Sequence, residues 1–100
     1  MRLMMNLWVV DNINCSGQWD PSIMPVTSSY DYARHYEYTP SAGNIGTNNN
    51  FTFKWQEDFD VYNDSLWKIE EFGDFSGNFC TFKSAGVAVE NGVLILSILN

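Results

Sequence analysis

The sequence predicts an all-β fold, and three observations lead to this prediction. Several segments alternate apolar and polar residues with the two-residue period of a half-buried strand, and no segment shows the period of an amphipathic helix. Gly, Pro, Asn and Asp cluster between the alternating segments, as they do in turns. The 100 residues are 45% hydrophobic and 16% aromatic, which is typical of a globular chain. Short strands at this spacing predict a sandwich of antiparallel sheets.

The first 40 residues predict two strands. Residues 2–10 form a dense apolar run that stops at a turn-prone stretch, so we expect one long strand buried on both faces. Pro21 and Pro25 then exclude regular pairing in residues 19–25. Residues 28–40 alternate, which predicts a half-buried strand. One of its faces carries Tyr30, Tyr32, Tyr36 and Tyr38, and the other carries Asp31, His35 and Glu37.

The rest of the chain predicts four more strands. Residues 41–50 are rich in Gly and Asn without any period, and we expect a flexible connection there. Residues 51–59 alternate again and predict a strand. Phe51, Phe53 and Trp55 are expected on one face of it, with Thr52, Lys54 and Gln56 on the other. A single helical turn is expected in residues 60–67, and strands are expected in residues 78–83, 86–90 and 93–100, the last two joined by a tight turn at residues 90–92.

Charge and composition exclude several classes of partner. The net charge is −7 with only five Lys and Arg, so the chain lacks the basic surface that nucleic acid requires. No apolar run is long enough to span a membrane, and the first ten residues lack the pattern of a signal peptide. Two cysteines and one histidine cannot form a structural zinc site. An acidic, aromatic-rich chain remains compatible with neutral ligands such as carbohydrates.

Six motifs, taken in the order in which they occur, resemble segments of a known enzyme family. MMNLW, GQWDPSIMP and YDYARHYEYTP are similar to the C-terminal strands of glycoside hydrolase family 16, specifically the endo-β-1,3-1,4-glucanases called lichenases. WQEDFDVYNDSLW, NFCTFKSAGV and NGVLILSI are similar to the N-terminal strands of the same family. The end of the family pattern therefore precedes its beginning, as in circularly permuted lichenases. Such permutation is tolerated because domain termini usually lie close together.

The resemblance implies part of a concanavalin A-like jelly-roll sandwich. It divides the chain into C-terminal-type strands (1–40), a permutation linker (41–50) and N-terminal-type strands (51–100). The implied full-length activity is retaining hydrolysis of mixed-linkage β-glucan, which these enzymes perform with an E-x-D-x-E strand. That motif is missing from the 100 residues, and in the nearest acidic cluster Glu57 faces away from Asp58 and Asp60. We therefore assign no catalytic residue and expect the chain to be inactive.

The resemblance also implies binding residues. The positions that would contact glucan are Asn6, Trp8, Phe72, Phe75 and Asn78. A structural calcium ion would be held at Asp31, Asp58 and Gly92, and calcium accepts such oxygen ligands. In each case a purely structural role is the alternative: the aromatic residues would be core, Asp31 a solvated strand residue, Asp58 a turn acid and Gly92 a hairpin glycine.

Three further expectations follow. The resemblance implies a secreted protein, in which Cys80 would be paired with a cysteine in the part not present here; pairing with Cys15 and a buried free thiol are the alternatives. Strand edges left unpaired in a half-sandwich would favour self-association. The competing function is a non-catalytic β-sandwich that binds glycans or serves as an interaction module.

Overall fold

The computed structural model describes residues 2–10, 12–72 and 80–99, and it is all-β, as predicted. Helical structure in these residues is limited to short segments, and none of them is long and apolar enough to cross a membrane. They are the single turn α1 (Ile13–Ser16) and the 3₁₀ segments η1 (Pro21–Ile23), η2 (Thr47–Asn49) and η3 (Ser84–Gly86).

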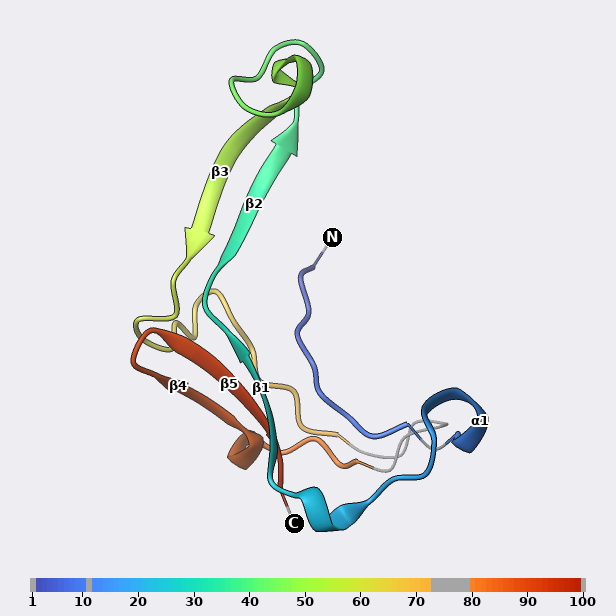
Figure 1. Cartoon of the computed structure of the whole chain (residues 1–100). Coiled ribbons are helices and arrows are strands. Elements are labelled where there is room, and N and C mark those ends of the chain that lie inside the picture. The colour runs from blue at the N-terminus through green and yellow to red at the C-terminus, as the bar shows by residue number, and fades with distance from the viewer. Residues whose placement is uncertain (1, 11, 73–79, 100) are drawn as a thin grey trace.

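The strands form two antiparallel sheets, as expected for part of a sandwich (Figure 1). β1 (Val26–Tyr30), β5 (Val93–Ile98) and β4 (Val87–Glu90) form a three-stranded sheet in that order. β2 (Ala33–Tyr38) pairs with β3 (Phe51–Glu57) in a two-stranded ribbon. Figure 1 shows this ribbon projecting away from the three-stranded sheet.

The β4–β5 hairpin confirms the strands predicted in residues 86–90 and 93–100. Its turn pairs Glu90 with Val93, and both turn residues have positive φ angles, 53° for Asn91 and 76° for Gly92. This is the backbone of a type I′ turn, for which Asn-Gly is the preferred sequence. The sequence of the turn therefore fixes the register of the hairpin.

The strand predicted in residues 28–40 is in fact two strands in two sheets. β1 pairs with β5 as far as Tyr30 and Leu94, and β5 itself begins one residue before Leu94, after the hairpin turn. Beyond Tyr30, β1 therefore has no further residues of β5 to pair with. The chain leaves the sheet at Asp31 and Tyr32, and the next strand, β2, pairs with β3. The continuous alternation of the sequence concealed this change of partner.

A bulge in the ribbon corrects the predicted faces of β3. His35 faces Trp55, but the next residue, Tyr36, faces Phe53, so Lys54 is an extra residue in β3. Facing residues share one side of a sheet, and the consecutive residues His35 and Tyr36 lie on opposite sides. Trp55 and Phe53 therefore lie on opposite sides, and the prediction that they share a face is wrong. The same shift places Gln56, which faces Arg34, on the side of Phe51 and Phe53.

Two other predicted strands are absent from the described residues. Residues 2–9 form no strand; instead Met5 and Leu7 pack against the core cluster, so the apolar run reflects packing over the sheet rather than pairing within it. Residues 80–83 also form no strand, and residues 78–79 lie outside the described part of the chain. One backbone hydrogen bond, 2.7 Å from the Phe82 N–H to the Phe72 carbonyl, links this segment to the preceding one.

The segment predicted to be a flexible linker is a folded loop at the end of the ribbon. The Thr39 N–H donates to the Asn50 carbonyl (2.6 Å), and the Gly43 N–H donates to the Asn49 carbonyl (2.8 Å). Ile45 forms an isolated bridge with Phe51. A Cβ at Gly43 would collide with the Phe51 carbonyl, so the close approach of the loop to β3 requires glycine.

The core is small and gathers around β5. Phe59 (2% exposed), Leu94 and Leu96 (8% each) form its buried cluster, against which partly buried side chains from several segments pack. They are Met5, Leu7, Tyr30, Trp67, Val87 and Val89.

Glu57 connects the end of β3 to this cluster through side-chain hydrogen bonds. Its two carboxylate oxygens accept hydrogen bonds from the Phe59 N–H (2.8 Å) and from the Trp67 indole N–H (3.2 Å), and the rings of Phe59 and Trp67 lie 5.8 Å apart. Trp67 closes the predicted helical turn, because its N–H donates to the Asn63 carbonyl at 2.9 Å.

Leu94→Ala should destabilise the chain by about 2–5 kcal/mol, because it removes a buried side chain from the cluster and leaves a cavity. Leu66→Ala is the matched control, since Leu66 is 51% exposed and should change stability by about 0.5 kcal/mol or less. Urea unfolding followed by tryptophan fluorescence measures both. Equal effects of the two substitutions would show that β5 does not carry the core.

Candidate functional site

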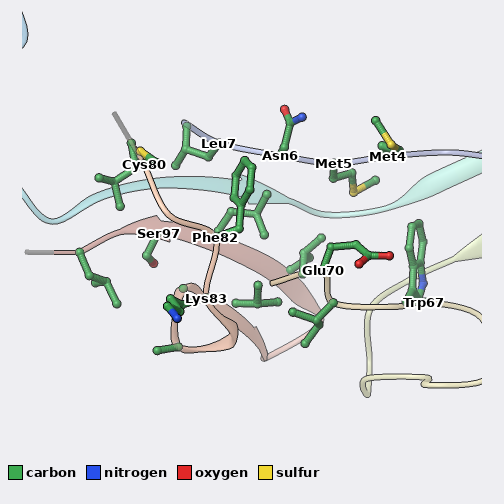
Figure 2. A pocket seen from close by; sticks show the side chains of 18 of the residues that line it. Met4, Met5, Asn6, Leu7, Trp67, Glu70, Cys80, Phe82, Lys83 and Ser97 are labelled. Atoms are coloured by element: carbon green, nitrogen blue, oxygen red, sulfur yellow. The ribbon is translucent and has the colours of Figure 1, made fainter. Parts of the chain in front are cut away.

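A groove of about 750 Å³ lies between the N-terminal segment and the three-stranded sheet (Figure 2). Its size is within the range of ligand-binding clefts. Side chains of residues 3–7, 67–70, 72 and 80–83 line it together with residues of β4 and β5, and most of them are apolar. Charged side chains also reach it: Glu70 and Lys83, and Lys68, which forms an exposed ion pair with Glu70 (3.2 Å).

The N-terminal segment divides its side chains between the core and the opposite side. Met5 and Leu7 are half-buried and Val9 is buried, whereas Asn6 is exposed. Figure 2 shows the Asn6 amide pointing away from the side on which Met5 and Leu7 lie. Asn6 contributes to the groove lining, and the half-buried Trp8 does not. Of these two predicted glucan contacts, the structure brings Asn6 to the groove and leaves Trp8 beside it.

Phe72 is the third predicted contact that can be placed. Its side chain lines the groove, is 49% exposed, and lies 4.9 Å from the ring of Phe82, which lines the groove as well. An exposed ring at a groove provides the flat apolar surface that a sugar ring requires. Phe82 was missed by sequence reasoning, although the alternation of residues 78–83 was the available signal. Phe75 and Asn78 lie outside the described residues.

The acidic cluster of residues 57–60 has structural partners. Both oxygens of Glu57 accept the hydrogen bonds that hold Phe59 and Trp67, and Oδ1 of Asp58 accepts one from the Gln56 amide. These contacts organise the chain after β3.

Of the three predicted calcium residues, the structure brings Asp58 and Gly92 close together, and Asp31 lies just beyond the last β1–β5 pair, Tyr30 and Leu94. Asp58 follows β3, Asp31 follows β1, and Gly92 lies in the turn. A Cβ built on Gly92 would lie 3.5 Å from Oδ1 of Asp60 and 4.0 Å from the Asp58 carbonyl oxygen. The β1–β5 register continues from Tyr30 toward this corner, and Asp31 is exposed there.

The donors in this corner suit a hard cation. Carboxylate and carbonyl oxygens are the ligands that calcium prefers. In the described part of the chain, no group of three His, Cys, Asp or Glu side chains is placed to hold a metal, so a site here would need backbone carbonyls. Asp60 was missed as a candidate, although its place in the acidic cluster was visible in the sequence. The calcium site therefore stays a prediction, and the oxygens that the structure places near Gly92 are the Asp58 carbonyl and Oδ1 of Asp60.

The cysteines occupy different surroundings. Cys15 is an exposed free thiol in α1. Cys80 is half-buried, and its sulfur accepts a hydrogen bond from the Val9 N–H at 3.2 Å. That contact joins the segment after residue 79 to the N-terminal segment.

Comparison with known proteins shows a similarity to a glucanase. No family model matches the chain. It is 30% identical over 96 residues to a protein described as Beta-glucanase from Fibrobacter succinogenes. The aligned region covers 96% of this chain and 27% of the relative, so the chain spans about a quarter of the length of the protein it matches. In sequence, therefore, the chain is glucanase-like.

Proposed function

We propose that this chain is part of a retaining endo-β-1,3-1,4-glucanase of glycoside hydrolase family 16, in which it supplies cleft-lining residues but no catalytic carboxylate. The observation that carries the proposal is the similarity to a beta-glucanase over nearly the whole chain. The reversed order of the motifs supports a circularly permuted arrangement, with residues 41–50 joining the two halves of the pattern.

The groove supports a polysaccharide ligand. Phe72 offers an exposed ring at the groove. Asn6 lies at the edge of the groove with its amide on the outer side of the N-terminal segment, where it could donate to and accept from the hydroxyls of a sugar chain that extends past this edge. The half-buried Trp8 lies in the same motif as Asn6 and is proposed to extend the aromatic surface. Phe75 and Asn78 remain proposed contacts by resemblance.

The chemistry would depend on residues outside this chain. Retaining glycosidases need a nucleophile and an acid/base carboxylate about 5–5.5 Å apart. The E-x-D-x-E pattern that provides them in this family is missing from the 100 residues, and Glu57 is already committed to structural hydrogen bonds. The proposed contribution of this chain is therefore to bind glucan and to position strands that carry the carboxylates. We place such an enzyme outside the cell, where its polymeric substrate is found.

We also propose a structural calcium ion at the corner formed by Asp31, the Asp58 carbonyl and the Gly92 carbonyl, with Asp60 as an additional carboxylate. Bound calcium would neutralise acidic groups in a chain of net charge −7. It would also tie together the ends of β1, β3 and the β4–β5 turn.

The function is tested by complementation. Co-expression with the region of the Fibrobacter relative that lies outside the match should give lichenan hydrolysis, because the two polypeptides together would contain both cleft walls and the carboxylates. Reducing-sugar release is measured for each polypeptide and for the pair. A partner with its motif glutamates changed to glutamine is the control. Glucan binding by this chain without activity of the pair would favour the non-catalytic binding module instead.

Trp8→Ala should weaken binding of soluble lichenan by roughly three- to tenfold, the loss expected for one aromatic contact. Affinity electrophoresis measures the binding, and Trp55→Ala, on the projecting ribbon, is the control. If Trp8→Ala instead unfolds the chain while Trp55→Ala does not, Trp8 is a core residue and its assignment to the cleft is wrong.

Calcium should raise the melting temperature by about 10–20 °C at concentrations about 100-fold above its dissociation constant, because it binds only the folded chain. Asp31→Asn should reduce this shift, whereas Asp64→Asn, at an exposed carboxylate in the 63–67 turn, should leave it unchanged. Melting temperatures that stay constant from chelator to millimolar calcium would exclude the site.

A further inference from the structure

One side of the β2–β3 ribbon gathers aromatic side chains in cross-strand pairs. The rings of Tyr36 and Phe53 lie 5.8 Å apart, and those of Tyr38 and Phe51 lie 5.5 Å apart. We call this side the aromatic face. It comprises Tyr32, Arg34, Tyr36, Tyr38, Phe51, Phe53 and Gln56.

Polar groups extend the same face toward the base of the ribbon. The guanidinium of Arg34 lies 4.4 Å above the Tyr32 ring, and its Nε donates a hydrogen bond to the Gln56 side chain. The face therefore combines flat rings with hydroxyl, amide and guanidinium groups, and this mixture is suited to a ligand that has both C–H surfaces and hydroxyls.

The aromatic face points away from the core. The opposite face carries Glu57, whose carboxylate binds the Trp67 indole, and Trp67 packs against the core cluster. Side chains on that opposite face are mostly half-buried, including Trp55, whereas Tyr38 is 64% exposed and Phe53 is 48% exposed. The row of aromatic side chains is thus not explained by packing against the core that the structure describes.

The charged side chains on the two faces of the ribbon indicate whether its ligand is charged or neutral. The chain has twelve Asp and Glu, yet none of them is among the residues of the aromatic face. The charged group of the face is Arg34, and the Asp58 carboxylate adjoins it at the base of the ribbon, where it accepts a hydrogen bond from Gln56. Glu37 lies on the opposite face in an ion pair with Lys54 (2.6 Å), and the hydrogen bond from Lys54 lowers the pKa of this carboxyl group. Single-stranded nucleic acid also stacks on aromatic rows, but it needs a basic groove that a chain of net charge −7 lacks. The complementary ligand is a neutral polymer.

The shape of the face favours an elongated ligand. Successive side chains on one face of a strand are about 7 Å apart, so the stretch from Arg34 to Tyr38 covers about 14 Å. The folded loop of residues 39–50 continues beyond its far end, held to β3 by the bridge between Ile45 and Phe51. A row of rings along an exposed ribbon offers repeated contacts to a chain of sugar units, more than a single small molecule could use.

From these observations we infer that the aromatic face of the β2–β3 ribbon is a second glycan-binding surface, separate from the groove, along which a β-glucan chain lies. The choice of β-glucan as the polymer rests on the proposed function. The surface would hold a polysaccharide while another stretch of the same polymer occupies the groove.

The test is affinity electrophoresis of the full chain in gels that contain lichenan, xylan or no polysaccharide. Tyr38→Ala should reduce retardation by lichenan, and the double variant Tyr38→Ala/Phe53→Ala should weaken binding roughly tenfold. Tyr38→Phe, which keeps the ring, should retain most of the binding. Thr52→Ala, on the opposite face of the ribbon, is the matched control, and circular dichroism establishes that each variant is folded. If Tyr38→Ala unfolds the chain, Gln56→Ala provides the second test, with a smaller loss expected.

The outcomes separate this inference from the proposed function. Lichenan binding that survives the double variant but is weakened by Trp8→Ala would overturn the second surface and leave the proposed function intact. Binding of xylan but not lichenan, lost in Tyr38→Ala, would support a glycan surface and overturn the assignment to β-glucan. Absence of binding to either polysaccharide would overturn the inference, as would a change of oligomeric state as the sole effect of the double variant.

Discussion

Burial of Phe59 against Leu94 and Leu96 is the interaction on which the other elements depend. β5 places both leucines on one face, and its neighbours β1 and β4 contribute half-buried residues around them. Phe59 adopts a φ of 54°, a conformation that costs a non-glycine residue energy, so its position must be stabilised from outside the backbone. Glu57 does this through its hydrogen bond to the Phe59 N–H. The same carboxylate holds Trp67, so one side chain joins the ribbon to the three-stranded sheet.

This core is small for the length of the chain. The radius of gyration is 17.3 Å, whereas a compact domain of 100 residues has about 13 Å. Large apolar side chains such as Met4 and Val61 are more than 70% exposed. So many exposed apolar side chains are typical of a sheet that lacks a second packed layer. The physical picture is of one wall of a sandwich, which agrees with the match to about a quarter of a longer glucanase.

The sequence predicts those elements that are determined by neighbouring residues, and it fails for those that depend on residues far away in the chain. The β4–β5 hairpin and the helical turn before Trp67 were predicted because Asn-Gly and a short-range hydrogen-bonding pattern determine them. The division of residues 28–40 between two sheets was not predicted, because it depends on where β5 begins, more than 50 residues away in the sequence. Residues 2–9 were misassigned because packing over a sheet and pairing within it produce the same apolar pattern.

The candidate sites show the same division. Sequence periodicity gave no indication that Asp58 and Gly92 lie close together, whereas the family resemblance assigned both to one site. The structure places the Asp58 carbonyl beside Gly92. Asp60 was overlooked because its relation to the β4–β5 turn follows from the unusual backbone at Phe59. Of the residues predicted to contact glucan, Asn6 and Phe72 line the groove and Trp8 does not, and their binding role stays a prediction.

The bulge at Lys54 is the feature that gives the ribbon two different faces. A shift of one residue moves side chains to the opposite side of a sheet. With strict alternation from Glu57, Trp55 and Phe53 would both lie on the side that faces the core. The extra residue lets Trp55 remain with Glu57 on the core side while Phe53 and Phe51 move outward to join Tyr36 and Tyr38. One inserted residue thus allows β3 to be anchored through Glu57 at its end and to display aromatic side chains along its exposed length.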